Sequence, residues 1–298
     1  METNFKSGFI AIVGRPNAGK STILNRLVGA KIAITTAKPQ TTRNRILGIL
    51  SEDDYQIVFV DTPGVHRSKT RLGEFMNHAA IGAIETVDAA LLMADATRGI
   101  GPAEERIIDE LTKKKIPAVL GLNKIDRISR EALLPQIAAY AEKFDFADII
   151  PISAKTGDGT EILLEALKKF LLPGPMYYPA DMITDKTERE IMAEFIREKL
   201  LSYLDQEIPH GTAVEVTEMR DEKKICHISA DIVCEKASHK SIIIGRGGAM
   251  LKRVGTAARE EAEHFFGKKI YLQLFVKVKD DWRNSNFMLK NLGFTDKE

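Results

Sequence analysis

The sequence has little of what secreted, zinc-stabilised and membrane-spanning proteins need. It contains only two cysteines in 298 residues, Cys226 and Cys234, which excludes a disulfide scaffold and a four-cysteine zinc site. No apolar run reaches the roughly 18 residues of a membrane span, and the N-terminus lacks the apolar core of a signal peptide. The 43 Lys and Arg nearly balance the 42 Asp and Glu, so the net charge of +1 favours no class of partner. We therefore expect a soluble cytoplasmic protein with reduced thiols.

The first part of the chain alternates short apolar runs with longer amphipathic segments. Apolar runs predict strands at 9–14, 55–61, 88–95, 116–124 and 147–153. Helices are predicted between them, at 20–28, 103–115, 131–144 and 160–171. Runs this apolar are typical of strands buried on both faces of a parallel sheet. The first part of the chain, 1–173, is therefore predicted to be an α/β doubly wound domain.

A segment rich in proline and glycine ends this alternation. It carries Pro173, Gly174, Pro175 and Pro179, and it predicts a linker at 174–186. The order of elements then changes to αββααβ, which predicts a second, α+β domain over 187–298. Its helices are expected at 187–204, 239–248 and 248–266, and its strands at 212–219, 224–234 and 268–279.

The first strand runs into a glycine-rich loop with the spacing GxxxxGK[ST]. The loop consists of Gly14, Arg15, Pro16, Asn17, Ala18, Gly19, Lys20 and Ser21. Between a strand and a helix, such a loop turns backbone N–H groups toward phosphates, and the helix N-terminus adds positive potential. The lysine of the loop would reach the β- and γ-phosphates, and the hydroxyl of Ser21 would bind Mg²⁺.

Three more motifs follow other strands, at the sheet edge where open α/β sheets bind ligands. The first is Asp61, Thr62, Pro63 and Gly64, whose carboxylate can hold Mg²⁺ and whose glycine N–H can meet the γ-phosphate. The second is Asn123, Lys124, Ile125 and Asp126, where a carboxylate can accept the N1 and amine protons of guanine. The third is Ser153, Ala154 and Lys155, where a backbone N–H can meet guanine O6.

These four motifs, in this order, resemble the P-loop GTPase family over roughly residues 5–173. The resemblance implies binding of GTP and GDP, Mg²⁺, and hydrolysis of GTP to GDP. It implies an effector-loop threonine that binds Mg²⁺; Thr42 is favoured over Thr35, Thr36 and Thr41. Lys20, Thr42, Gly64 and Asn17 are the candidate catalytic residues, and Ser21, Thr42 and Asp61 the candidate metal ligands.

One position departs from many small GTPases. Val65 stands where those proteins carry a glutamine that orients the attacking water, so slow basal hydrolysis is expected. The loop sequence GxPNxGKS also resembles potassium-activated GTPases, in which the residue matching Asn17 helps to bind K⁺. We therefore keep K⁺ as a further candidate cofactor.

The second domain carries a glycine motif of its own, GRGG, between two predicted helices. A GxxG loop in this position resembles a type II KH domain, which clamps the backbone of about four nucleotides. From 236 to 283 the chain has 11 Lys and Arg against 5 Asp and Glu, as a phosphate-binding face requires. The candidate RNA-binding residues are Ile244, Gly245, Arg246, Gly247, Gly248, Lys252 and Arg253. The only tryptophan, Trp282, is expected in the core rather than under a base.

One GTPase domain followed by one KH domain resembles the Era family of bacterial GTPases over nearly the whole chain. The resemblance implies binding to the 3′ end of 16S ribosomal RNA, assistance in maturation of the 30S subunit, and peripheral association with the inner membrane. We expect a monomer. Two alternatives stay open: an RNA-binding factor that holds GTP with little turnover, and a GTPase that acts on another RNA.

Overall fold

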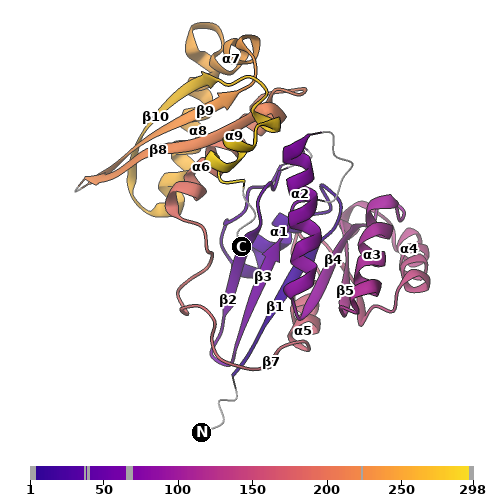
Figure 1. The fold of residues 1–298 in the computed structure, drawn as a ribbon. Helices are drawn as coiled ribbons and strands as arrows, with labels where there is room; N and C mark the ends of the chain where they lie inside the picture. The colour runs from indigo at the N-terminus through magenta and orange to yellow at the C-terminus, as the bar shows by residue number, and fades with distance from the viewer. Residues whose placement is uncertain (1–4, 37, 39–40, 65–69, 223, 295–298) are drawn as a thin grey trace. The chain divides into compact units, whose positions relative to one another are not determined.

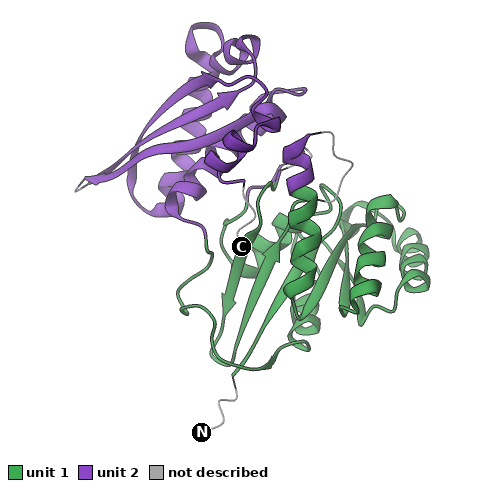
Figure 2. Cartoon of the chain, in the orientation of Figure 1, with its two compact units in different colours: residues 1–33, 42–67, 76–185 green, residues 34–41, 68–75, 186–298 purple. Residues whose placement is uncertain are grey.

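The computed structural model describes residues 5–36, 38, 41–64, 70–222 and 224–294. They form two compact units (Figure 2). Unit 1 comprises Met1–Ala33, Thr42–Arg67 and Met76–Asp185, and unit 2 comprises Ile34–Thr41, Ser68–Phe75 and Lys186–Glu298. Two short segments from within the N-terminal half of the sequence therefore belong to the C-terminal unit. None of the described helices is long and apolar enough to cross a bilayer.

Unit 1 is built on a mainly parallel sheet with the strand order β2-β3-β1-β4-β5-β6, and β7 pairs with β1 at one end (Figure 1). The pairs within the order are parallel except β2 with β3. The strands are β1 Lys6–Val13, β2 Ile46–Ser51, β3 Tyr55–Asp61, β4 Ala89–Asp95, β5 Ala118–Asn123, β6 Asp148–Ile152 and β7 Leu172–Pro173. The helices are α1 Lys20–Val28, α2 Arg71–Gly82, α3 Pro102–Lys114, α4 Arg130–Lys143 and α5 Thr160–Lys168.

Alternate residues of the central strand point into two different cores, as the two-residue period of a strand requires. Ile10 and Ile12 pack in the core that includes residues of α1 and α5. Ala11 and Val13 pack in the core that includes residues of α3 and α4. All four side chains are buried, which explains why this run is continuously apolar in the sequence. The predicted α/β doubly wound domain is confirmed.

The structure adds elements that the sequence analysis did not predict. β2 continues the sheet antiparallel to β3, and α2 follows the motif Asp61, Thr62, Pro63 and Gly64, called the DTPG motif below. The segment predicted as a linker packs with unit 1: Thr184 forms a bridge to Gly48, and the N–H of Ile49 donates to the carbonyl of Ile183 at 2.9 Å. The segment up to Asp185 thus belongs to unit 1, and the C-terminal part of unit 2 begins at Lys186.

Unit 2 is a three-stranded sheet in the order β10-β9-β8, with β9 and β10 parallel and β8 and β9 antiparallel. Its main elements are α6 Glu188–Tyr203, β8 Thr212–Glu222, β9 Ile225–Cys234, α7 Ala237–Ile244, α8 Ala249–Phe266 and β10 Lys269–Val278. Their order is the predicted αββααβ. Thr187 caps α6 by accepting from the N–H of Glu190, whose carboxylate accepts from the N–H of Thr187 in return.

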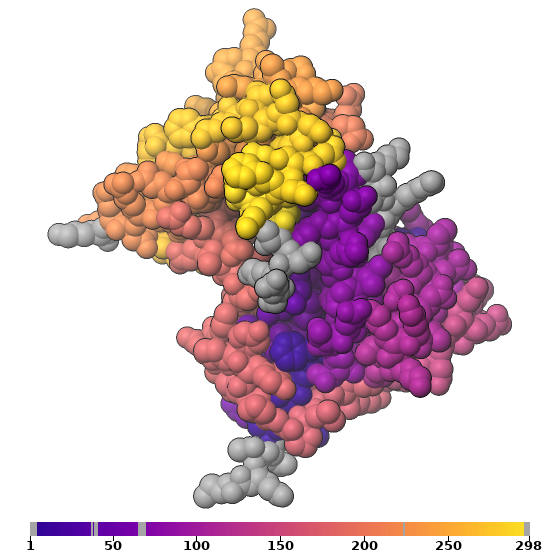
Figure 3. Space-filling view, viewed as in Figure 1, coloured from indigo at the N-terminus to yellow at the C-terminus, as the bar shows by residue number. Residues whose placement is uncertain are grey.

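The described residues that follow β10 pack on unit 2. Trp282 is fully buried and donates its indole N–H to the carbonyl of Gly211 at 3.0 Å, so it is a core residue as predicted. It is followed by a short helix that was not predicted, α9 Asn286–Asn291. α9 belongs to the yellow surface of unit 2 in Figure 3. Its residue Phe287 is 72% exposed.

Candidate nucleotide site and RNA interface

The phosphate loop leaves β1 and enters α1 at Lys20. The ammonium group of Lys20 is buried and donates to the carbonyls of Gly14 and Arg15, at 3.0 and 3.1 Å. Burial lowers the pKa of Lys20 to about 8, although the carboxylates of Asp61 and Glu104 oppose the shift. A phosphate group at this loop would restore a full partner to the buried charge.

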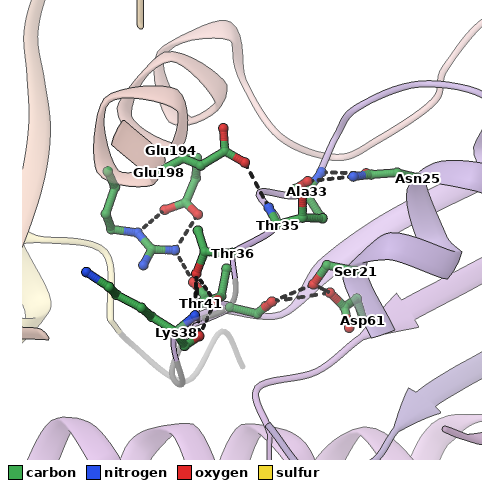
Figure 4. A network of polar contacts seen from close by, with 12 residues as sticks. Ser21, Asn25, Ala33, Thr35, Thr36, Lys38, Thr41, Asp61, Glu194 and Glu198 are labelled. Carbon is green, nitrogen blue, oxygen red and sulfur yellow. Dashed lines mark hydrogen bonds and ion pairs between the residues drawn. The ribbon is translucent and has the colours of Figure 1, made fainter. Parts of the chain in front are cut away.

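Three oxygen-bearing side chains from different elements converge beside the loop, and they are the three candidate metal ligands. The hydroxyl of Ser21 lies 2.8 Å from the hydroxyl of Thr42 and donates to Asp61 Oδ2 at 2.8 Å. Thr42 donates to the same carboxylate oxygen at 3.4 Å. Figure 4 shows Ser21 and Asp61 within this network. Of the four threonines considered, Thr42 is the one that meets Ser21 and Asp61, whereas Thr36 and Thr41 contact each other at 2.9 Å.

The surroundings of the Asp61 carboxylate suit a bound cation. Asp61 is fully buried, and its Oδ1 has no hydrogen-bond partner among the residues that the structure describes. Burial raises the pKa of Asp61 to about 6, against the opposing effect of Lys20 and of hydrogen bonds from Ser21 and Thr42. A hard cation with oxygen ligands fits this set and would hold the carboxylate ionised. The described part of the chain contains no group of three His, Cys, Asp or Glu side chains that could hold a metal ion. The hydroxyls of Ser21 and Thr42 are the other side-chain oxygens beside Asp61.

The DTPG loop passes close to the phosphate loop. A Cβ on Gly64 would lie 2.6 Å from the backbone nitrogen of Pro16, so only glycine fits there. The hydroxyl of Thr62 donates to the carbonyl of Ile12 at 3.0 Å and ties the motif to β1. Val65, the residue that departs from the glutamine of many small GTPases, lies outside the described residues.

The candidate guanine-binding residues gather at the ends of β5 and β6. Asn123 is buried: its amide donates to the carbonyl of Ala18 at 2.8 Å, and its oxygen accepts from the N–H of Ala154 at 2.9 Å. The hydroxyl of Ser153 donates to Asp126 Oδ1 at 2.7 Å and orients the carboxylate. The side chains of Asn123 and Ser153 thus join the phosphate loop, the NKxD motif (123–126) and the SAK motif (153–155).

Several supporting residues were missed by the sequence analysis. Arg26 of α1 donates to the carbonyls of Ala154 and Lys155, at 2.9 and 2.7 Å, and fixes the SAK loop. Asp95 at the end of β4 pairs with Lys124 at 2.6 Å. Neither residue belongs to a sequence motif that would indicate its role. The partners of Arg26, for example, lie 128 and 129 positions away in the sequence.

The side chain of Arg15 was assigned to the nucleotide only as part of the loop. It pairs with the buried Glu104 of α3, with Nε 3.1 Å from the carboxylate, and lies 3.4 Å from the carbonyl of Asp95. The guanidinium of Arg15 therefore anchors the phosphate loop to α3. Its backbone carbonyl accepts from the ammonium group of Lys20 inside the loop.

The GRGG motif of unit 2 connects α7 to α8. Its three glycines adopt a backbone conformation that other residues rarely adopt. Gly245, Gly247 and Gly248 have φ values of 75, 59 and 80°, the left-handed region that favours glycine. A Cβ on Gly247 or Gly248 would meet nothing within 4 Å, so this loop is open on its outer side. Arg246 and Gly247 are exposed.

A groove of about 370 Å³ continues from this loop between α8 and β10. Its lining combines small, apolar and basic residues: Gly248, Leu251, Lys252, Gly255, Thr256, Arg259, Leu272 and Leu274. Of the two basic residues predicted to follow the loop, Lys252 lines the groove. Arg253 instead places its guanidinium 4.1 Å above the ring of Tyr203 on α6.

Comparison with known proteins identifies the family. Residues 9–124 match the family described as "50S ribosome-binding GTPase", and residues 207–283 match "KH domain". GTPase Era of Alkaliphilus metalliredigens is 49% identical over 98% of this chain and 99% of the relative. GTPase Era of Clostridioides difficile is 49% identical over 98% of this chain and its own full length. The chain belongs to the Era family. It is a GTPase with a C-terminal KH domain.

Solved Era structures have the same fold. Era in complex with MgGDPNP and nucleotides 1506–1542 of 16S ribosomal RNA is 37% identical, with a TM-score of 0.95 over 98% of this chain and all of that one. An Aquifex aeolicus Era variant bound to GDP and AlF4⁻ has the same identity, score and coverage. The Era fold thus covers both units of this chain.

Proposed function

We propose that this GTPase binds the 3′ end of 16S ribosomal RNA through unit 2, assists maturation of the 30S subunit, and uses GTP to control that binding. The observation that carries the proposal is the open GRGG loop beside a groove lined by Lys252 and Arg259. Backbone N–H groups without a neighbouring Cβ, together with basic side chains, suit a nucleic-acid backbone. The Era relative that binds a 16S ribosomal RNA fragment supports this choice of RNA.

Mg²⁺ is the proposed metal of the nucleotide site, held by Ser21, Thr42 and, through water, Asp61. When bound, it would neutralise charge on the β- and γ-phosphates. Three residues of the chain would bind the nucleotide itself. Lys20 would reach the phosphates, the N–H of Gly64 would meet the γ-phosphate, and Asp126 would select guanine. Because Val65 cannot orient water through its side chain, we expect slow basal hydrolysis.

K⁺ is a proposed accelerator of hydrolysis beside Asn17. The backbone of Asn17 has φ 63°, so the loop turns sharply at this residue. A monovalent cation there would place positive charge next to the phosphates, which is the part that an arginine finger plays in other GTPases. Equal GTPase rates in KCl and NaCl would remove this part of the proposal. Peripheral contact with the inner membrane is the remaining proposal from the family resemblance, and sedimentation with vesicles of inner-membrane lipid would test it.

The test of RNA binding uses glycines at the two ends of one helix. Gly248→Asp adds a negative charge at the N-terminus of α8, where φ is 80°. Gly267→Asp is the matched control, because Gly267 caps the C-terminus of the same helix with φ 66° and equally open surroundings. We expect Gly248→Asp to weaken binding of a 16S 3′-end oligonucleotide at least tenfold, and Gly267→Asp to leave it within about twofold.

RNA affinity is measured with GDP and with Mg·GDPNP. Tighter binding in the GTP analogue, lost in Gly248→Asp alone, supports a GTP-controlled RNA-binding factor. Equal loss in both variants, or a wild-type affinity that is the same for unrelated RNA, contradicts it. The second of these results would favour the alternative of a GTPase that acts on another RNA.

A further inference from the structure

The last turn of α1 lies against the SAK motif, and both belong to unit 1. Arg26 of this turn donates from Nε to the carbonyl of Ala154 at 2.9 Å and from Nη2 to the carbonyl of Lys155 at 2.7 Å. One guanidinium thus holds two consecutive carbonyls. The backbone at Gly157, with φ 102°, comes so close that a Cβ there would lie 2.8 Å from Nη1 of Arg26. The loop 154–157 therefore packs along the guanidinium.

The other hydrogen bonds of this loop show which of its N–H groups is left for a ligand. The N–H of Ser153 donates to a backbone carbonyl at 2.9 Å, and the N–H of Ala154 donates to Asn123 Oδ1 at 2.9 Å. The N–H of Thr156 donates to the hydroxyl of Ser153 at 3.2 Å. Within the described residues, the N–H of Lys155 makes no such bond. It is therefore the N–H group of the motif that is available to guanine O6.

Arg26 fixes this N–H through the peptide group that carries it. The carbonyl of Ala154 and the N–H of Lys155 belong to one planar trans peptide, in which the two groups point to opposite sides. A donor that holds the carbonyl therefore sets the direction of the N–H. A charged donor at the carbonyl oxygen also polarises the peptide, which makes its N–H a stronger donor. An acceptor such as guanine O6 would thus meet an N–H that is already oriented.

The position of Arg26 also allows a simpler role. A positive side chain in the last turn of a helix stabilises the negative end of the helix dipole, and a lysine would serve that purpose equally well. Two carbonyls held by two different nitrogens, at 2.9 and 2.7 Å, instead require the planar fork of a guanidinium. The substitution Arg26→Lys therefore separates the two roles, because it keeps the charge and removes the fork.

We propose that Arg26 is a positioning residue for guanine recognition: it holds the peptide between Ala154 and Lys155 so that the N–H of Lys155 is presented to guanine O6. Without Arg26, the nucleotide has to order this peptide itself, and that cost cancels the gain from an oxygen at position 6 of the base. The inference rests on the proposed recognition of guanine by the NKxD and SAK motifs.

The test compares Arg26→Ala and Arg26→Lys with wild type in the full-length chain. Calorimetry gives dissociation constants for three diphosphates. They are GDP, 6-thio-GDP, which keeps the N1 and 2-amino protons but has sulfur, a weak acceptor, in place of O6, and IDP, which keeps O6 but lacks the 2-amino group. The matched control is Arg106→Ala, because Arg106 is an exposed arginine of α3 outside the four motifs.

We expect wild type to bind 6-thio-GDP about fivefold more weakly than GDP, which corresponds to about one neutral hydrogen bond. In Arg26→Ala, GDP affinity falls about fivefold and 6-thio-GDP affinity stays near wild type, so the two come within about twofold of each other. The IDP to GDP ratio stays within about twofold of wild type, because it reports the contact of Asp126 with the 2-amino group. Arg26→Lys gives an intermediate preference for GDP over 6-thio-GDP, since an ammonium lacks the fork that holds both carbonyls. Arg106→Ala binds all three nucleotides like wild type.

Three results overturn the proposal, and they differ in what else they remove. If wild type prefers GDP to 6-thio-GDP and Arg26→Ala keeps that preference, the positioning role is wrong while guanine recognition by the motif stands. If wild type binds both equally, the proposed contact with O6 fails and the positioning role fails with it. If Arg26→Lys keeps the full wild-type preference, charge at the end of α1 is sufficient and the fork has no role. This last comparison also decides the matter should Arg26→Ala not fold.

Discussion

Asn123 offers a sharp test of how the nucleotide site is assembled, because one side chain joins two loops. Its amide donates to Ala18 in the phosphate loop, and its oxygen accepts from Ala154 in the SAK motif. Asn123→Ala removes both hydrogen bonds and leaves a buried carbonyl and a buried N–H without this partner.

The magnitude follows from those two groups. A buried donor or acceptor left unsatisfied costs about 1–3 kcal/mol, so the substitution should destabilise unit 1 by about 2–6 kcal/mol. GDP affinity should fall in addition, by at least about tenfold. The reason is that nucleotide binding would have to restore an arrangement of Ala18 and Ala154 that the folded protein no longer holds.

Asn25 provides a matched control within unit 1. It makes the same reciprocal bridge, donating to the carbonyl of Ala33 at 2.7 Å and accepting from the N–H of Ala33 at 2.9 Å. It is half-buried and touches neither the NKxD nor the SAK motif, so Asn25→Ala should cost about 1–3 kcal/mol of stability and leave GDP affinity unchanged.

Urea unfolding followed by circular dichroism gives the stabilities, and calorimetry gives the GDP affinities. We expect both variants to lose stability and only Asn123→Ala to lose GDP affinity. If Asn25→Ala weakens GDP as much as Asn123→Ala does, the effect is general destabilisation and the bridge has no special role. If Asn123→Ala binds GDP like wild type, the two loops hold their places without it.

Three further predictions follow from single contacts. Asp126→Asn should weaken GTP binding at least about a hundredfold, since an amide would face the donors of guanine, and should improve binding of the xanthine nucleotide. Equal loss of affinity for both nucleotides in competition binding would contradict this. Trp282→Phe should destabilise unit 2 by about 2–4 kcal/mol in urea unfolding, because it removes the hydrogen bond to Gly211 and leaves a void; a smaller change than 1 kcal/mol, roughly one ordinary hydrogen bond, would refute the assigned role. Burial raises the pKa of Cys226 to about 11 and also raises that of Cys234, so the reactive thiolates are scarce at pH 8. Alkylation of the folded protein should then be at least about a hundredfold slower than in urea and should speed up as the pH rises; labelling at the same rate in both states would contradict it.

Much of the molecule could be predicted because its signals are local. The strand-to-loop-to-helix step at Gly14–Ser21 and the order αββααβ are both readable within a few dozen residues. β2 was missed because Gly48 interrupts its apolar run. The structure explains the glycine: a Cβ there would lie 2.4 Å from the side chain of Leu24 on α1, so a larger residue would have to displace that leucine.

The supporting residues of the site could not be predicted, since their partners are distant in sequence. Arg26 looks like an exposed helix arginine until the SAK loop, more than 120 positions later, is placed against it. Ser153 was assigned with its motif, but its contact with Asp126 depends on the packing of β5 beside β6. Periodicity shows which face of an element is buried and does not show what the face meets.

The membership of 34–41 in unit 2 also has a consequence for how the protein is made. Arg197, which donates to the carbonyl of Thr41, is synthesised 156 positions after it, and at roughly 5–20 residues per second the ribosome needs about 8–30 s to add them. The start of α2 waits longer, because Arg71 contacts Asn284 and Asn286 near the end of the chain. The sheet of unit 1 is complete in the nascent chain before either segment can reach its final place. These two segments of unit 2 thus reach their final contacts only after the C-terminal part of the unit has been translated.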